Sequence, residues 1–317
     1  MLIGAYYLRA HTYTFVPRHI REDMEWMAGV GTKAVVLGIL EQDLYAAISN
    51  VRLICEEAAR AGMEVWAVPC RWGGLVAGAP KVPSYFTSVH PETWILDKEG
   101  KMLECCIGPS SSVHHPATLE FVVHSADSML RIWPIKGIIW DEVKILDRMD
   151  YCPAARQALG DRIDDFDAHT DAAAEFFNRA NVAIRRRHPD VALAMFIYGH
   201  FTGHLVEAPA AIETLDYFGC DGSPWFTGES EDREKLKKML LDEGLRFLDA
   251  ARRHNKKTLW LIENHDLVDV DVDLMDRRLP EVLAYKPDLL LYYYYGRNSE
   301  SPDRNMSVLG KHLRSVS

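Results

Sequence analysis

The chain has 317 residues, which is enough for two small domains or for one large α/β barrel. Its formal net charge of −10 argues against a nucleic-acid-binding surface, because no basic stripe is present that could displace counterions from phosphate. Six cysteines, none in a Cys-x-x-Cys pair, fit free buried thiols in a reducing compartment. The N-terminus lacks the features of a signal peptide, and no apolar run reaches membrane-spanning length. We therefore predict a soluble, cytoplasmic protein with neither a nucleic-acid nor a membrane partner; the sequence gives no indication of its oligomeric state.

Short apolar runs rich in β-formers alternate with amphipathic helical patterns from the start of the chain. In the first half the predicted strands are 2–7, 33–40, 63–70 and 135–142, and the predicted helices are 17–31, 44–61 and 116–131. Pro17 stands as at a helix start, and Gly31 as at a helix end. A long irregular stretch, about 73–115, separates the third and fourth strands. Within it, residues 94–106 predict a hairpin that turns at Lys98-Glu99-Gly100.

The second half repeats this rhythm. Its predicted strands are 191–200, 215–223, 257–265 and 287–298, and its predicted helices are 163–187, 208–213, 230–254, 273–284 and 302–314. Strands that are almost continuously apolar and alternate with helices are typical of a parallel sheet covered by helices. Eight such units favour a closed (β/α)8 barrel over an open sheet, and no Gly-rich phosphate loop follows the first strand. We predict one barrel over 1–317, with an insertion over about 73–115.

Catalytic groups of such barrels lie at the C-terminal ends of the strands and in the loops beyond them. The apolar run Gly137-Ile138-Ile139-Trp140 ends there in two adjacent acids, Asp141 and Glu142, and the seventh strand ends in Glu263. The other candidate residues at these ends, predicted to bind substrate, are Tyr7, His11, Arg71, Trp72, Lys144, Tyr198, His200, Asp221, Trp225, Asn264, His265, Tyr294 and Arg297. Aromatic rings stack on the C–H faces of sugars, and the polar groups bind hydroxyls. Glycosidic cleavage needs two carboxyl groups beside the anomeric carbon, one that protonates the leaving oxygen and one that attacks or activates water.

Two short segments resemble the catalytic sites of clan A retaining glycoside hydrolases, which include the family 42 β-galactosidases. The segment WDE (140–142) is similar to the strand-four site of that clan, and LWLIENH (259–265) is similar to the strand-seven site. YFGCDGSPW (217–225) resembles the strand-six segment of family 42. The resemblance implies that Glu142 is the acid/base and Glu263 the nucleophile. The sequence departs from the clan at Asp141, where the clan usually has an Asn that donates to the sugar 2-hydroxyl; a carboxyl group can donate only when protonated.

A longer stretch, residues 90–142, is similar to the hypothetical glycosyl hydrolase 6 group and to related α-galactosidase- and fucosidase-like barrels. That resemblance implies Asp141 as the nucleophile on strand four, with Asp221 as the acid. The adjacent pair Asp141-Glu142 also resembles the Asp-Glu pair of family 20 hexosaminidases, in which a substrate acetamide is the nucleophile. Adjacent carboxylates should raise the pKa of one member, which suits an acid that must be protonated near neutrality.

We therefore predict a glycoside hydrolase that acts on a small carbohydrate substrate without a cofactor or a metal. Three alternatives remain at this point: a glycosidase with Asp141 as nucleophile and Asp221 as acid, a metal-dependent isomerase or hydrolase barrel, and a carbohydrate-binding barrel without catalysis. A metal site would combine His11, His200, Asp221 and His265, although the His-x-His of amidohydrolase barrels is absent. His114-His115-Pro116 is interpreted as a helix start rather than a pair of ligands.

Overall fold

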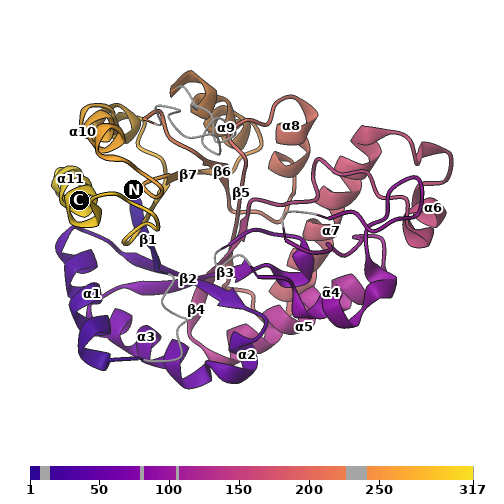
Figure 1. Ribbon diagram of the computed structural model, residues 1–317, viewed down its shortest axis with the longest axis horizontal. Helices are drawn as coiled ribbons and strands as arrows, with labels where there is room; N and C mark the ends of the chain where they lie inside the picture. Colours follow the sequence, from indigo (N-terminus) through magenta and orange to yellow (C-terminus); the bar gives the residue numbers. More distant parts are fainter. Residues whose placement is uncertain (8–14, 79–81, 105–106, 226–240, 317) are drawn as a thin grey trace.

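Eight parallel strands close into a barrel in the order of the chain, with helices packed around it (Figure 1). The computed structural model describes residues 1–7, 15–78, 82–104, 107–225 and 241–316. The strands are β1 Leu2–Tyr7, β2 Ala34–Leu40, β3 Glu64–Cys70, β4 Ile135–Asp141, β5 Ala192–Ile197, β6 Tyr217–Asp221, β7 Lys257–Ile262 and β8 Leu289–Tyr293. The barrel closes where β1 pairs with β8, and the predicted (β/α)8 fold is confirmed.

The helices in the described residues are α1 Pro17–Gly29, α2 Asp43–Ala46, α3 Ile48–Arg60, α4 Tyr85–Val89, α5 Pro116–Ile132, α6 Pro153–Leu159, α7 Phe166–Arg187, α8 His204–Ala210, α9 Leu241–Arg253, α10 Asp269–Ala284 and α11 Pro302–Arg314. Pro17 and Pro116 occupy the first turns of α1 and α5, as the sequence predicts. The predicted helix 44–61 is divided into α2 and α3 at Ala47, and α6 was not predicted. The N-terminal part of the predicted helix 230–254 lies outside the described residues.

The barrel interior is filled by alternate residues of each strand, since successive side chains of a strand point to opposite faces. The interior cluster consists of Tyr6, Ala34, Val36, Trp66, Val68, Cys70, Ile139, Ala194, Phe196, Leu259, Leu261, Leu289 and Leu291. Trp66 needs space that Gly137 provides, because a Cβ atom at Gly137 would lie 2.4 Å from the Trp66 ring. The opposite faces of the strands pack against the helices in a second, larger apolar cluster.

The loop after β3 carries the predicted insertion, which contains α4 and lies beside the segment that leads into α6 (Figure 1). Tyr151 N donates to Leu96 O at 2.9 Å, and a carboxylate oxygen of Asp150 accepts from Leu96 N at 3.3 Å. The regular hairpin expected over 94–106 is not confirmed. Its described residues form isolated antiparallel bridges, including Leu96 with Met102 around the turn at Gly100.

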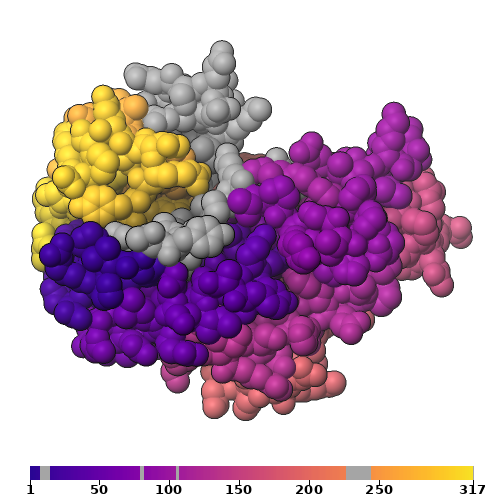
Figure 2. Space-filling view, turned by 60° about the horizontal axis from the view of Figure 1, so that its bottom comes forward, coloured from indigo at the N-terminus to yellow at the C-terminus, as the bar shows by residue number. Residues whose placement is uncertain are grey.

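Glu41, at the end of β2, fastens the start of this insertion to the barrel. Its buried carboxylate accepts hydrogen bonds from Gly73 N (3.0 Å), Ser84 Oγ (2.6 Å) and Phe86 N (2.7 Å). Burial raises the pKa of Glu41, and these donors lower it in part. Figure 2 shows the insertion (purple) and the C-terminal helices (orange and yellow) on opposite sides of one face of the molecule.

Four cysteines in the described residues, Cys55, Cys70, Cys152 and Cys220, are buried free thiols. Cys105 and Cys106 lie outside the described residues. Within the part of the chain that the structure describes, no helix is both long and apolar enough to cross a lipid bilayer.

Candidate active site

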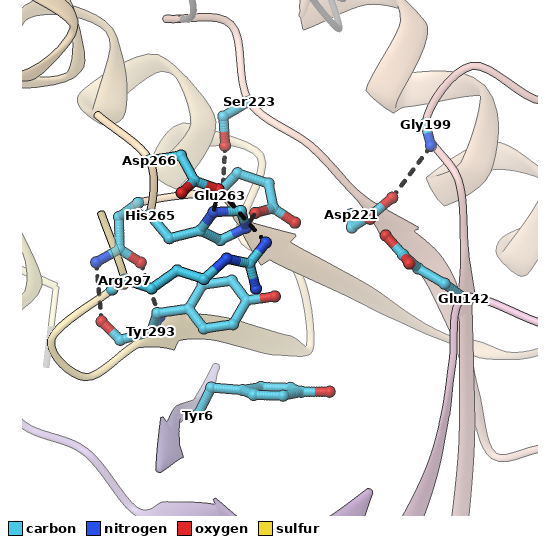
Figure 3. Close-up of polar contacts among 12 residues, drawn as sticks. Tyr6, Glu142, Gly199, Asp221, Ser223, Glu263, His265, Asp266, Tyr293 and Arg297 are labelled. Atoms are coloured by element: carbon cyan, nitrogen blue, oxygen red, sulfur yellow. Dashed lines mark hydrogen bonds and ion pairs between the residues drawn. The ribbon is translucent and has the colours of Figure 1, made fainter. Parts of the chain in front are cut away.

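The alternation of the strands places five polar side chains at the C-terminal end of the barrel interior. Asp141, Glu263 and Tyr293 each follow an interior residue by two positions, namely Ile139, Leu261 and Leu291. Asp221 ends β6, and Tyr6 belongs to the interior cluster near the end of β1. Figure 3 shows the side chains of Tyr6, Glu142, Asp221, Glu263 and Tyr293 converging on one space.

Glu142 reaches the same space although it follows the inward-pointing Asp141 directly. Its φ of 38° lies in the left-handed region, which side chains other than glycine seldom adopt, and this turns the chain out of the strand. Its backbone N–H donates to Phe196 O at 3.0 Å. The Lys144 ammonium group forms an ion pair with the Glu142 carboxylate and donates to the hydroxyl of Tyr198. The side chain of Lys144, one of the residues predicted to bind substrate, is 7% exposed.

Asp221 and Glu142 face each other (Figure 3). Their side chains are hydrogen-bonded, which requires one of the two carboxyl groups to carry a proton. Burial raises the pKa of Asp221 well above its ordinary value, and the charge of Glu142 raises it further. Burial would also raise the pKa of Glu142, but the Lys144 ammonium and the hydrogen bond from Asp221 lower this pKa to about 2. The shared proton therefore resides on Asp221, and Glu142 is ionised. Gly199 N donates to Asp221 at 3.2 Å and fixes its orientation.

Asp141 lies beside this pair and accepts a hydrogen bond from the hydroxyl of Tyr6. Burial, followed by the charge of Glu142, raises the pKa of Asp141 to about 7. At neutral pH this carboxyl group is only partly ionised. The sequence-based expectation that adjacent acids raise one pKa is met here at Asp141, although burial is the larger cause.

Glu263 lies on the other side of the space and forms an ion pair with His265 through its Oε2. The Nδ1 of His265 contacts Asp266 at 2.6 Å, and Arg297 lies 3.4 Å from the same Asp266 oxygen. Burial alone would lower the pKa of His265, but Glu263 and Asp266 raise it to about 9, so His265 is an imidazolium at neutral pH. Burial would raise the pKa of Asp266, but His265 lowers it to about 2.

The backbone around Glu263 is held by two side chains of the loop after β6. Ser223 Oγ accepts from Glu263 N at 2.7 Å, and the indole N–H of Trp225 donates to Glu263 O at 2.8 Å. Trp225 is fully buried, so its ring supports the strand end and does not face the barrel mouth.

Four further residues that we expected to contact a sugar occupy packed positions instead. Trp72 is 1% exposed and donates its indole N–H to Ile39 O at 2.8 Å. Tyr7 and Tyr294 point away from the interior and donate their hydroxyls to Asp23 of α1, at 2.5 and 2.9 Å. The side chain of Asn264 bonds to the backbone of Tyr293 through both its oxygen (2.7 Å) and its nitrogen (2.8 Å), which joins β7 to β8. These residues hold the backbone and the helices around the site in place, and their side chains are not directed at a substrate.

The remaining candidates lie around the site or outside the described residues. Arg71 is buried, has a φ of 60°, donates to Gly78 O at 3.1 Å and lowers the pKa of both Asp141 and Glu142. His200 is exposed and its ring lies 5.1 Å from that of Tyr198. His11 lies outside the described residues.

Two tyrosines of the site, Tyr6 and Tyr293, were missed by the sequence analysis, which selected their neighbours Tyr7 and Tyr294. Their rings lie 5.0 Å apart, and the ring of Tyr293 also meets His265 edge-on at 4.7 Å. Burial raises the pKa of Tyr293, and the charges of Glu263, Asp141, Glu142 and Asp221 raise it further, which places this phenol within the field of all four carboxyl groups. The spacing Leu289, Leu291, Tyr293 is the signal that identifies the interior face.

No arrangement of three His, Cys, Asp or Glu side chains suited to a metal ion occurs among the residues that the structure describes. Both ring nitrogens of His265, one member of the set considered above, face carboxylates. The proposed histidine ligand His11 cannot be placed, because it is outside the described ranges.

No protein-family model and no curated protein sequence matches the chain. Solved structures are similar to it. The cold-adapted β-galactosidase from Rahnella sp. R3 superposes with a TM-score of 0.71 at 12% identity, covering 99% of this chain and 56% of that chain. The β-galactosidase from the psychrophilic Marinomonas ef1 gives 0.69 at 12% identity, covering 99% and 60%. The catalytic domain of β-amylase from Paenibacillus polymyxa gives 0.64 at 9% identity, covering 99% and 98%.

The chain has the barrel fold of these enzymes. It spans less than two thirds of the length of either β-galactosidase. At these identities the likeness shows the fold, and the function must be argued from the site.

Proposed function

We propose that the protein is a glycoside hydrolase whose substrate is a small glycoside or oligosaccharide. The observation that carries this proposal is the group of carboxyls at the barrel mouth: Glu142, which shares a proton with Asp221, and Glu263, which is paired with an imidazolium. A site that holds one available proton and one separate carboxylate meets the needs of glycosidic cleavage. The barrel likeness to β-galactosidases and a β-amylase is consistent with this chemistry.

In the proposed first step, the carboxylate of Glu263 attacks the anomeric carbon and forms a glycosyl ester. The bond from that carbon to the leaving oxygen breaks as the proton of Asp221 passes to Glu142 along their hydrogen bond, and the electron pair of the broken bond takes this proton from Glu142. In the second step Glu142 removes a proton from water, the water oxygen attacks the anomeric carbon, and Glu263 leaves. The proton returns to the Glu142–Asp221 pair, so the sugar keeps its anomeric configuration.

Glu142 is assigned as the group that contacts the leaving oxygen because its side chain is 18% exposed, whereas Asp221 is 6% exposed. The alternative nucleophile, Asp141, is less suitable, because a carboxyl with a pKa of about 7 that accepts from Tyr6 is a weaker anion at neutral pH. A partly protonated Asp141 could instead donate to a sugar hydroxyl, as the Asn of clan A does.

The test begins with a panel of p-nitrophenyl glycosides that includes β-galactoside, followed by kinetics of variants on the best substrate. Glu142→Gln and Glu263→Gln should each lower kcat/KM by about three orders of magnitude or more, because each removes one half of the acid–nucleophile pair. Glu281→Gln on the exposed face of α10 is the matched control and should retain full activity.

Two further measurements decide the stereochemistry and the roles. Proton NMR of the first product should show the same anomer as the substrate, and azide should restore turnover to Glu263→Gly as a glycosyl azide of opposite configuration. Near-normal turnover by Glu263→Gln would exclude Glu263 as the nucleophile. Binding of sugars without turnover by the native protein would favour the carbohydrate-binding alternative.

A further inference from the structure

His265 lies between two carboxylates at the end of β7. Its Nε2 contacts Glu263 Oε2 in an ion pair, and its Nδ1 lies 2.6 Å from Asp266 Oδ2. The side chain of His265 is 5% exposed, and the ring of Tyr293 of β8 meets it edge-on with the ring centroids 4.7 Å apart. With a carboxylate in contact at each nitrogen, the charged ring, which carries both protons, is favoured over either neutral tautomer.

The arrangement is supported from the adjoining β8–α11 loop. Asp266 has a φ of 53°, and its N–H donates to Arg297 O at 2.7 Å. Its side chain also meets the Arg297 guanidinium at 3.4 Å. Gly296 permits the loop to lie this close, because a Cβ atom there would be 2.7 Å from the Cα of His265. Two strand ends therefore fix the imidazole ring in one orientation.

Glu263 needs a counter-charge in this position. The charge of Glu263 raises the pKa of Asp221, so the two carboxyl groups are close enough to interact, and Tyr293 is in the field of both and of Asp141 and Glu142. Glu263 is 5% exposed, so little water reaches its carboxylate to screen it from these neighbours. The adjacent imidazolium supplies the opposite charge at this position.

We propose that His265 is a positioning residue that supplies the counter-charge to the Glu263 carboxylate and holds its Oε2, so that Oε1 is the atom presented to the substrate. Asp266, backed by Arg297, keeps the ring charged and oriented. This inference rests on the proposed function, in which Glu263 is the nucleophile. It adds a counter-charge for the nucleophile among the neighbouring carboxyl groups, and it assigns to each oxygen of Glu263 a separate task.

The first test is independent of activity. In protein labelled with ¹⁵N at histidine, both side-chain nitrogens of His265 should show imidazolium shifts at pH 7, and the ring should titrate near pH 9. In Asp266→Asn the titration should move to lower pH, because one carboxylate partner is lost. A neutral His265 at pH 7, or an unchanged titration in Asp266→Asn, would overturn the inference.

The second test is the pH profile of kcat/KM for the native enzyme and the variants. The native profile should fall near pH 9, and in Asp266→Asn the alkaline limb should move down with the His265 titration. His265→Gln should lose that limb and lower kcat about 10- to 100-fold with a smaller change in KM. His188→Gln, which removes a histidine paired with Asp127 at 2.9 Å beyond the far end of the barrel, is the control and should leave both limbs unchanged.

The outcomes separate the two hypotheses. If Glu263→Gln is inactive but His265 is neutral, the proposed function holds and the role of His265 is refuted. If Glu263→Gln retains full turnover, Glu263 is not the nucleophile; that part of the proposed function fails, and the role assigned to His265 fails with it. A profile of His265→Gln that is lowered uniformly at every pH would indicate a structural defect and would also refute the role.

Discussion

Replacing Asp141 with asparagine should stabilise the folded protein at pH 8 but not at pH 4. Asp141 is 4% exposed, and its pKa is raised to about 7 by burial and by the adjacent Glu142. Asparagine has nearly the same shape, and its carbonyl oxygen can still accept the hydrogen bond from Tyr6. The substitution therefore removes a buried charge and leaves the packing in place.

The magnitude follows from the two protonation equilibria of Asp141. Its pKa is about 7 in the folded protein and about 3.9 in an unfolded chain. Well below pH 4 both states are protonated, and the carboxyl group does not change the free energy of unfolding. As the pH rises from 4 to 7 the unfolded chain releases its proton first, so the folded state loses up to about 4 kcal/mol of stability, and the loss is complete above pH 7. Asp141→Asn should recover about 2–4 kcal/mol of this at pH 8.

The assay is urea denaturation of the native protein and of Asp141→Asn at pH 4, 6 and 8, with unfolding monitored by tryptophan fluorescence. The difference in the free energy of unfolding should grow with pH. Asp161→Asn, an exposed substitution with the same change in net charge, should show no such trend. A difference that is independent of pH, or a less stable Asp141→Asn at pH 8, would refute the assignment of a buried, repelled carboxylate.

The remaining predictions concern the ammonium group at the site, the barrel interior and metal ions. Lys144→Met should raise the pKa of Glu142 from about 2 to above about 4, since burial then acts without the opposing cation; a ¹³C NMR titration of the glutamate carboxyls measures this, and an unchanged pKa would contradict it. Gly137→Ala should destabilise the protein by about 1–3 kcal/mol in urea, because its Cβ would meet Trp66 at 2.4 Å. Gly29→Ala, where nothing lies within 4 Å, should have no destabilising effect, and equal losses in both variants would exclude steric overlap as the cause. Because no proposed step uses a metal ion, EDTA should leave kcat/KM unchanged, and restoration of a lost activity by a divalent ion would refute that mechanism.

The fold and the carboxyl groups of the site were predictable from local patterns. Eight apolar runs separated by amphipathic helices suffice to predict the barrel. The fold then places the C-terminal end of every strand on the same face of the barrel. Asp141, Asp221 and Glu263 could be selected because each acid interrupts an apolar run at its C-terminal end. Their roles in catalysis remain a proposal.

The orientation of aromatic residues was harder to predict, because a shift of one position reverses the face of a strand. At the end of β8 and in the turn that follows, the tyrosines from Tyr292 to Tyr295 are chemically identical, and only the register of β8 against β1 distinguishes the inward Tyr293. The indoles of Trp72 and Trp225 follow strand ends in the sequence but bond to backbone carbonyls in the core. The position of Trp72 and Trp225 in the sequence does not show that their side chains turn into the core.

The location of the protons could not be predicted from sequence at all. It depends on Lys144 turning toward Glu142, and on His265 pairing with both Glu263 and Asp266. These contacts depend on the left-handed backbone at Glu142 and Asp266, where the residue types themselves do not require it.

The hydrogen bonds of Glu41 have a consequence for how the molecule opens. The amides of Gly73 and Phe86 belong to an irregular loop, yet both donate to a carboxylate buried at the end of β2. Breaking these hydrogen bonds would leave the buried carboxylate of Glu41 without its donors, which is costly. This end of the insertion should therefore separate from the barrel only when the whole protein unfolds. In native-state hydrogen exchange, these two loop amides should be protected as strongly as those of the central strands.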